Sequence, residues 1–325
     1  MHAHVIVNRR ARRFLGPGPL FAELRRARPG IELTETNSLA ELDAVSRAVR
    51  TYGRERAVVL AGGDGSHMAG VSALARAFGD APLPPIAFAP GGTVGTVARN
   101  WGMSGEPVRY VARLLDAIAD GSVRKTRRPT LRIREVAPRA HGEPRADGDD
   151  VGATNRVGFI FGAGLVARFF ELYEARGASG NLTAARIAAR VFAGSFVGSR
   201  FARDVLRPTS CSLDLDGSPA PFDRMSLLCA SVVRDLGLGL RLTYRAGSSL
   251  DRFHAVATPL GPRALGPQMP LVLAARPLVG TRVDSLVEEL RLRFPEGTGA
   301  YVLDGDLFRA DAVTVTAGPV LDVLG

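Results

Sequence analysis

Cysteine, lysine and long apolar runs are all scarce in this chain of 325 residues. The two cysteines, Cys211 and Cys229, form no CxxC pair and have no histidine close to them in the sequence. This spacing argues against a disulfide framework or a zinc site. No apolar run reaches the about 18 residues that a membrane-spanning helix needs, and the first residues lack the apolar stretch of a signal peptide. We therefore expect a cytoplasmic protein without a transmembrane segment.

The positive charge of the chain is almost entirely arginine, because Lys125 is the only lysine. The formal net charge is +10, which by itself would suit a nucleic-acid-binding protein. No recognition-helix or zinc-finger motif accompanies that charge, so we expect no nucleic-acid partner. Attraction to anionic phospholipid, or a plain solvated arginine surface, explains the same charge.

Apolar periodicity divides the chain near residue 125. Before that point, buried-strand runs such as 57–61 alternate with segments whose apolar residues recur at helical spacing, such as 39–49. Repeated β-α-β units predict a parallel sheet with helices on both faces. We expect an α/β nucleotide-binding domain over residues 1–125, with about 308–325 as a candidate segment that returns to complete it.

The second part of the chain, residues 126–307, is expected to be mostly antiparallel β structure. The predicted strands lie at 130–136, 156–161, 211–216, 225–233, 239–244, 253–257, 285–294, 300–303 and, beyond this part, 313–317. Between them, residues 165–206 carry aromatic and aliphatic residues at helical spacing, which predicts a helical insertion. Its aromatic residues either line an acyl-chain pocket or belong to the core.

The strongest motif is the sequence GGDGS at 62–66, between a buried-strand run and a helix. Glycines let backbone N–H groups approach phosphate oxygens, and the positive end of the following helix adds to the attraction. The carboxylate of Asp64 would project to where phosphates and Mg²⁺ meet. An ordinary glycine-rich turn is the alternative, but five turn residues in this context favour a nucleotide site.

Two further turns follow the first. The sequence PGGT at 90–93 again joins a strand to a helix, and both turns are expected to open at the carboxyl edge of one parallel sheet, where α/β proteins bind ligands. The sequence DGD at 304–306 carries two carboxylates close to the chain end. A plain β-hairpin turn also explains it, since Asp-Gly is a favoured hairpin dipeptide.

Together these motifs resemble the diacylglycerol kinase catalytic-domain family, which includes bacterial lipid kinases and sphingosine kinases. The likeness rests on Asn8 at the end of the first strand, GGDGS, PGGT followed by Ala98-Arg99, DGD, and the segments 161–174, 236–246 and 252–259. The resemblance implies a first domain similar to phosphofructokinase and NAD kinase, and a second domain that is a β-sandwich. It also implies a nucleotide in the cleft between them, facing the lipid.

The resemblance implies roles for individual residues as well. The residues expected to bind ATP are Asn8, Thr34, Gly62, Gly63, Asp64, Gly65, Ser66, His67, Gly92 and Thr93, with Asp64 also as the Mg²⁺ ligand. His67 is the weakest of these, because a histidine at a helix start is more often merely exposed. Asp304 or Asp306 would deprotonate the lipid hydroxyl, with Asp64 as the third catalytic carboxylate.

The expected protein is thus an ATP- and Mg²⁺-dependent lipid kinase that phosphorylates diacylglycerol or a related lipid alcohol, peripheral at the inner membrane surface. The sequence names neither the lipid nor the oligomeric state.

The chain departs from the family pattern at several positions. The N-P-x-S-G start is replaced by residues 8–12, an Asn-Asp pair by Gly95-Thr96, a family Asp by Val166, and a Glu by Asp306. Carboxylates that would order Mg²⁺ or water are thereby lost, while the nucleotide-binding turns are kept. Two alternatives stay open: a non-catalytic nucleotide- or lipid-binding homologue, and a soluble-substrate kinase similar to NAD kinase, which also carries GGDG.

Overall fold

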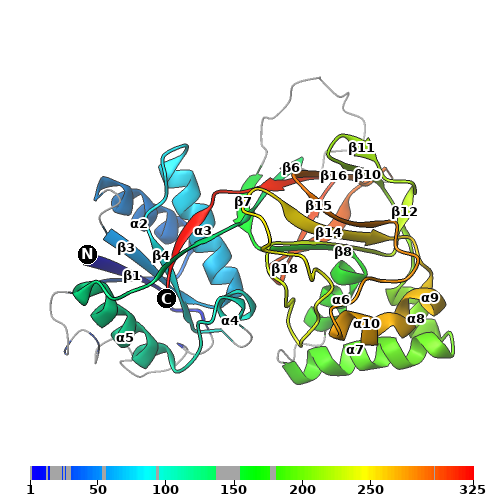
Figure 1. Cartoon of the computed structure of the whole chain (residues 1–325), viewed down its shortest axis with the longest axis horizontal. Helices are drawn as coiled ribbons and strands as arrows, with labels where there is room; N and C mark the ends of the chain where they lie inside the picture. Colours follow the sequence, from blue (N-terminus) through cyan, green and yellow to red (C-terminus); the bar gives the residue numbers. More distant parts are fainter. Residues whose placement is uncertain are drawn as a thin grey trace. The chain divides into compact units, whose positions relative to one another are not determined.

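The computed structural model of the chain forms two compact units (Figure 1). The described residues are 2–11, 14, 24, 26, 31–52, 56–92, 95–136, 154–175, 181–295 and 297–325. Unit 1 comprises Met1–Arg128 with Pro319–Gly325, and unit 2 comprises Pro129–Gly318. The boundaries that we expect from the sequence lie near residues 125 and 308. In the structure the segment 308–318 belongs to unit 2, and only the last residues return to unit 1.

Unit 1 is built on a six-stranded sheet in the order β2–β1–β3–β4–β20–β5. Four of its strands run parallel: β1 (His2–Asn8), β2 (Glu32–Thr36), β3 (Arg56–Gly62) and β4 (Ile86–Pro90). β20 (Leu321–Leu324) runs parallel to β4, and β5 (Lys125–Arg128) is antiparallel to β20. Because both faces of the sheet are covered, β3 and β4 read as continuous apolar runs rather than as alternating patterns.

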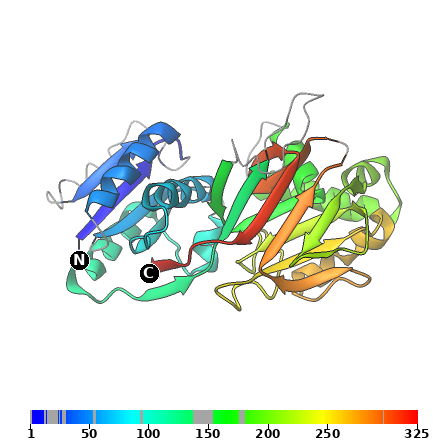
Figure 2. The same ribbon diagram turned by 90° about the horizontal axis from the view of Figure 1, so that it is seen from above.

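Helices cover both faces of this sheet, as Figures 1 and 2 show. They are α2 (Leu39–Thr51), α3 (Asp64–Phe78), α4 (Thr96–Asn100) and α5 (Pro107–Asp120). α5 shares one core cluster with Val59 of β3. The neighbouring Leu60 points to the opposite face, where Gly70 of α3 lies against it. Strand β3, which leads into the GGDGS turn, is therefore clamped between helices on both sides.

Unit 2 contains two six-stranded antiparallel sheets and one two-stranded ladder. The first sheet consists of β6 (Leu131–Val136), β7 (Thr154–Gly158), β10 (Ser212–Leu215), β11 (Ser218–Pro219), β16 (Glu289–Arg293) and β19 (Ala312–Ala317). The second consists of β8 (Ile160–Gly164), β13 (Leu227–Ser231), β14 (Phe253–Thr258), β15 (Val283–Val287), β17 (Gly299–Leu303) and β18 (Asp306–Ala310). The ladder joins β9 (Thr209–Ser210) to β12 (Arg224–Met225). The hydroxyl of Tyr301 in the second sheet donates to the carboxylate of Glu135 in the first, so the two sheets face each other.

The helices of unit 2 gather on the other face of the second sheet (Figure 1). They are α6 (Leu165–Glu174), α7 (Asn181–Phe196), α8 (Arg200–Val205), α9 (Pro262–Leu265), η3 (Gly266–Gln268) and α10 (Met269–Leu273). Ile187 and Val191 of α7 are buried in one cluster with Cys229 and Val256 of the sheet. Among the helices of the described segments, none combines the length and the apolar character required to cross a bilayer.

The predicted fold class is confirmed by this arrangement, with corrections to individual strands of unit 2. The predicted strands 156–161 and 225–233 are each divided between two sheets, at Phe159 and at Ser226. Residues 239–244 form no strand, because Gly237, Leu238 and Gly239 all have positive φ and turn the chain repeatedly. The predicted strand 285–294 is two strands, β15 and β16, which belong to different sheets and are separated at Glu288.

Candidate functional site

The two glycine-rich turns of unit 1 lie against each other at the carboxyl ends of β3 and β4. These parallel strands pair as far as Gly62 and Pro90, so both turns leave the same edge of the sheet. The N–H of Gly91 donates to the carbonyl oxygen of Gly62 at 2.6 Å. A Cβ added to Gly92 would lie 2.5 Å from the Cα of Gly63. Glycine is needed at this contact because any side chain would push the turns apart.

The carboxylate of Asp64 joins the first turn to the helix that follows the second. α4 is preceded by Gly95, which has no side chain to cap the helix. Instead, Oδ2 of Asp64 accepts from the N–H of Thr96 at 2.8 Å, and Oδ1 accepts from the N–H of Val97 at 3.1 Å. Asp64 thus caps α4 from another element, satisfying two amides that a helix start leaves without partners.

This geometry bears on the expectation that Asp64 binds Mg²⁺. Both of its oxygens accept backbone N–H groups, and within the described segments no group of three or more His, Cys, Asp or Glu side chains could hold a metal ion. Mg²⁺ prefers octahedral oxygen coordination at short distances. Each oxygen of Asp64 accepts one backbone N–H group, which gives this carboxylate a positioning role, while its binding of Mg²⁺ stays a prediction.

Asn8 and Ser66 connect the first turn to strand β1. The side-chain Nδ2 of Asn8 donates to Oγ of Ser66 at 2.7 Å, and the N–H of Gly63 donates to the same oxygen at 3.3 Å. Oδ1 of Asn8 accepts from the N–H of Arg10 at 2.9 Å. Gly65 lies beside them in the first turn of α3, whose positive end opens at this edge. The structure therefore brings Asn8 and the whole GGDGS turn together.

His67 lies in the core and does not line the turn. Its side chain is fully buried and stacks on Phe88, with 4.5 Å between ring centroids. Burial lowers the pKa of His67, and its Nε2 lies 3.4 Å from the carbonyl oxygen of Ala89. The expectation that His67 contacts a phosphate or is merely exposed is corrected, because a ring enclosed by core residues presents no surface to a ligand.

The two expected threonines differ in what the structure shows. Thr34 lies on the edge strand β2 beside Ile6, two positions before the strand ends, and its hydroxyl contacts Nε2 of His4 at 2.8 Å. It is Thr36 that lies level with Asn8 at the strand end. Thr93 lies outside the described residues.

In unit 2, the DGD motif forms the tight turn between β17 and β18. Asp304 and Gly305 have φ of +50° and +94°, the positive values that a type I′ hairpin turn requires. The Asp304 carboxylate points inward and accepts from the N–H groups of Phe159 and Ile160 at 2.9 to 3.1 Å. Asp304 is 7% exposed, whereas Asp306 is exposed. Asp306 is therefore the carboxylate of this motif that a ligand can reach.

Helix α6 places aromatic side chains beside this hairpin. A Cβ added to Gly305 would lie 3.6 Å from the ring of Phe170. Phe170 makes edge-on contacts with Phe169 and Tyr173, with centroids 5.7 and 6.2 Å apart, and all three rings are half-buried. Half-buried apolar surface thus lies next to an exposed carboxylate.

The family-model comparison matches residues 2–127 to the diacylglycerol kinase catalytic domain. The resemblance read from the motifs is thereby confirmed for this segment, which contains Asn8, GGDGS and PGGT. The search of curated proteins found no match.

Solved structures share the fold of the whole chain, including the part beyond the diacylglycerol kinase catalytic domain. A diacylglycerol kinase from Bacillus anthracis is similar over 99% of this chain and 96% of its own, with 12% identity and a TM-score of 0.58. A yeast NADH kinase, solved with NADH, is similar over 100% of this chain and 83% of its own, with 13% identity and a TM-score of 0.51. At these identities the likeness shows the fold alone.

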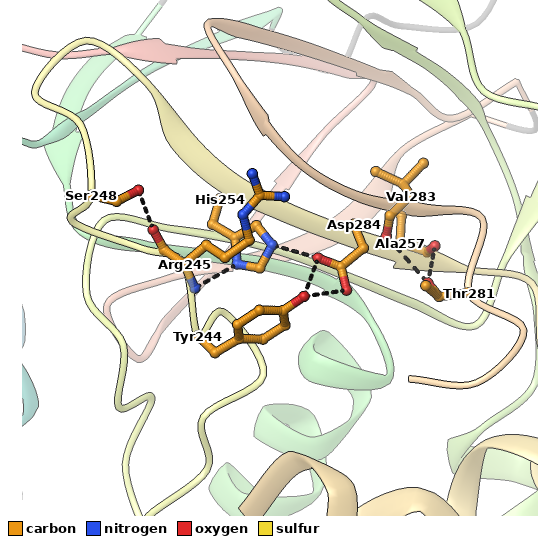
Figure 3. A network of polar contacts seen from close by, with 8 residues as sticks. All are labelled: Tyr244, Arg245, Ser248, His254, Ala257, Thr281, Val283 and Asp284. Carbon is orange, nitrogen blue, oxygen red and sulfur yellow. Dashed lines mark hydrogen bonds and ion pairs between the residues drawn. The ribbon is translucent and has the colours of Figure 1, made fainter. Parts of the chain in front are cut away.

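A polar network in unit 2, not expected from the sequence, lies outside the diacylglycerol kinase catalytic domain (Figure 3). Nε2 of the buried His254 lies 2.7 Å from Oδ1 of Asp284, and the hydroxyl of Tyr244 donates to both oxygens of that carboxylate at 3.1 Å. The N–H of Arg245 donates to Nδ1 at 3.3 Å, so Nε2 carries the proton in the neutral ring. Protein groups occupy both ring nitrogens, and the network holds the segment around Tyr244 on β14 and β15.

We expect Asp64→Ala to loosen α4 in unit 1 while leaving the sheet intact. Loss of the cap should raise hydrogen exchange at Thr96 and Val97 and lower the free energy of unfolding by about 1–2 kcal/mol. Glu106→Ala is the matched control, because Glu106 caps α5 through the N–H groups of Val108 and Arg109. Faster exchange in α4 after Glu106→Ala but not after Asp64→Ala would contradict the capping role.

His254 should make the stability of unit 2 depend on pH. Burial lowers its pKa against the opposing effect of Asp284, so the unfolded chain takes up this proton at a higher pH than the folded one. The contribution is fully present above about pH 6.5 and is lost as the pH falls from there to the folded pKa. Unfolding free energies at about pH 7.5 and 5.5 should differ less in His254→Phe than in the wild type. An equal difference would rule out this origin.

Proposed function

We propose that the protein is a kinase that transfers the γ-phosphoryl group of ATP to the hydroxyl of diacylglycerol or a related lipid alcohol at a membrane surface. The observation that carries this proposal is the backbone contact between Gly63 and Gly92. It brings two glycine turns to one edge of a parallel sheet, beside the N-terminus of α3. Backbone N–H groups and a helix start at such an edge favour phosphate oxygens.

The proposed phosphate site is made from backbone and small polar side chains. Its residues are Asn8, Gly62, Gly63, Gly65, Ser66, Gly92 and Thr93, with Thr34 on the neighbouring strand. Asn8 and Ser66 are fixed by their mutual hydrogen bond, so little further ordering is needed when a phosphate binds. Both oxygens of the Asp64 carboxylate accept backbone N–H groups at the start of α4, which offsets part of its negative charge.

Mg²⁺ is proposed to arrive as a complex with the nucleotide. In phosphoryl transfer this ion neutralises charge on the phosphate oxygens, which themselves supply several of its ligands. The chain's own contribution is to hold the phosphates and to position the acceptor hydroxyl.

Asp306 is the proposed base for the acceptor hydroxyl. It is exposed, whereas the carboxylate of Asp304 is bonded to two backbone N–H groups and holds the hairpin in place. The half-buried rings of Phe169, Phe170 and Tyr173 lie on the helix beside this hairpin. Apolar surface next to a carboxylate suits a substrate that carries its hydroxyl on a hydrocarbon body.

The experiment below also distinguishes two other functions, a soluble-substrate kinase and a non-catalytic homologue. A soluble-substrate kinase would share the GGDG turn, and the yeast NADH kinase shares the fold. A non-catalytic homologue would bind nucleotide without turnover, in line with Val166 at a position where the family carries a carboxylate.

The deciding experiment is incubation with labelled ATP, Mg²⁺ and a panel of diacylglycerol, sphingoid and glycerolipid alcohols, with NAD and NADH as further arms. We expect labelled phospholipid. Labelled NADP or NADPH would instead favour the soluble-substrate kinase, and ATP binding without any labelled product would favour the non-catalytic homologue.

Variants of the DGD hairpin should separate chemistry from structure. Asp306→Asn should lower kcat by about 10²–10⁴-fold with the fold unchanged, because a general base contributes about that much. Asp304→Asn should lower stability, since its carboxylate accepts two backbone N–H groups.

Asp216 supplies the matched control for Asp304. It is the first residue of the β10–β11 hairpin turn, has a φ of +48°, and its Oδ1 accepts from the N–H groups of Glu288 and Glu289. Because Asp216 is exposed and Asp304 is buried, Asp216→Asn should destabilise unit 2 less than Asp304→Asn does. If Asp304→Asn abolishes turnover at unchanged stability while Asp306→Asn retains it, the base is assigned to the wrong carboxylate.

A further inference from the structure

The outward side of α7 in unit 2 is apolar and arginine-rich. Figure 1 shows this helix along the lower border of the unit. Exposed and half-exposed positions recur every three or four residues and fall on one stripe: Leu182, Ala185, Arg186, Ala189, Arg190, Ala193, Phe196 and the following Val197. We refer to these residues as the α7 face. Leu182 is 64%, Phe196 59% and Val197 77% exposed, which is unusual for such side chains in water.

The inward side of the same helix is already packed. Ile187 and Val191 are buried against the second sheet of the sandwich, and Ser195 is fully buried with its hydroxyl donating to the carbonyl oxygen of Phe192 at 2.6 Å. Core packing therefore accounts for the helix without the α7 face. The apolar side chains of that face are left for a partner outside the chain's own core.

The charged residues along positions 181–203 all have one sign. Residues 181–203 contain Arg186, Arg190, Arg200 and Arg203 and no Asp or Glu, the next acidic residue being Asp204 on α8. The side chain of Arg200 is 92% exposed and reaches Asp204 only at 4.0 Å. The guanidinium of Arg190 stacks over the ring of Phe201 at 4.2 Å. Apolar and cationic groups thus occupy the same surface.

We propose that the α7 face docks the protein on a bilayer that contains anionic phospholipid. A helix lying in a bilayer interface buries its apolar side chains at the acyl boundary while its arginines meet lipid phosphates. The small side chains of Ala185, Ala189 and Ala193 make this stripe shallow, which suits a fluid surface. A second copy of the chain, related by a two-fold axis, would bring arginines against arginines, so charge disfavours self-association through this face.

Vesicle co-sedimentation tests the proposal with the full chain. Vesicles of equal parts phosphatidylglycerol and phosphatidylcholine should bind it, vesicles of phosphatidylcholine alone should bind it weakly, and added salt should weaken the binding. Arg186→Ala with Arg200→Ala should lower the affinity for anionic vesicles about 25-fold, at roughly fivefold per arginine. Phe196→Ala with Val197→Ala should lower it by about tenfold or more.

Control substitutions come from α2 in unit 1, where Arg47 and Leu39 are exposed. Arg47→Ala and Leu39→Ala should leave vesicle binding unchanged, and thermal unfolding should show all variants folded. Vesicle binding that is absent in the wild type, or unaffected by both the arginine and the Phe196/Val197 double variants, would overturn the proposal. So would self-association without vesicles that the same variants abolish, because the face would then be an interface between copies.

The docking proposal goes beyond the proposed kinase activity and is tested separately from it. Vesicle binding needs neither ATP nor turnover. If the protein binds vesicles but phosphorylates no lipid, the kinase proposal alone is wrong. If it phosphorylates dispersed lipid without binding vesicles, the docking proposal alone is wrong.

Discussion

The approach of Gly63 to Gly92 is the constraint on which the rest of the candidate site depends. A single Cβ at either position would meet the opposite backbone at 2.5 or 3.2 Å, so the two turns lie in backbone contact only because both residues are glycine. Asp64 then fixes the geometry from the side by capping α4. Together, the contact and the cap hold the two turns next to each other at one edge of the sheet.

In unit 2, as with Asp64 in unit 1, aspartate carboxylates fix the backbone by accepting N–H groups, here at hairpin turns. Asp304 and Asp216 each begin a tight turn with a positive φ, and the carboxylate of each accepts backbone N–H groups at the start of another strand. These two turn aspartates therefore stabilise the fold through hydrogen bonds to the backbone. Asp306 stands apart because it begins a strand on the exposed side of the hairpin.

Much of the fold and part of the site could be predicted from the sequence. Continuous apolar runs ending in glycine identified β3 and β4, and the parallel sheet then required their turns to share an edge. The burial of His67 could also have been predicted from the sequence. His67, Val71, Leu74 and Phe78 lie at helical spacing on one face of α3, and all four are buried. Its position beside the GGDGS motif, at the start of a helix, predicted an exposed side chain instead.

Other features depend on contacts that no local pattern encodes. Asp64 caps amides 32 positions further along the chain, and His254 pairs with an aspartate 30 positions away. The inward turn of Asp304 and the outward position of Asp306 follow from how the hairpin meets β8, which the letters DGD do not reveal. In the segment 239–244, which the sequence predicted as a strand, the chain turns because Gly237, Leu238 and Gly239 all have positive φ.

Calorimetric titration of ATP into the wild type and Gly92→Ala tests the central claim most directly, with Gly261→Ala as the control at a glycine that has nothing within 4 Å of an added Cβ. The account predicts that the wild type and Gly261→Ala bind ATP alike. It predicts that Gly92→Ala, folded as judged by the fluorescence of Trp101, binds at least about tenfold more weakly, a loss of about 1.4 kcal/mol. ATP binding of equal strength in all three proteins would contradict it.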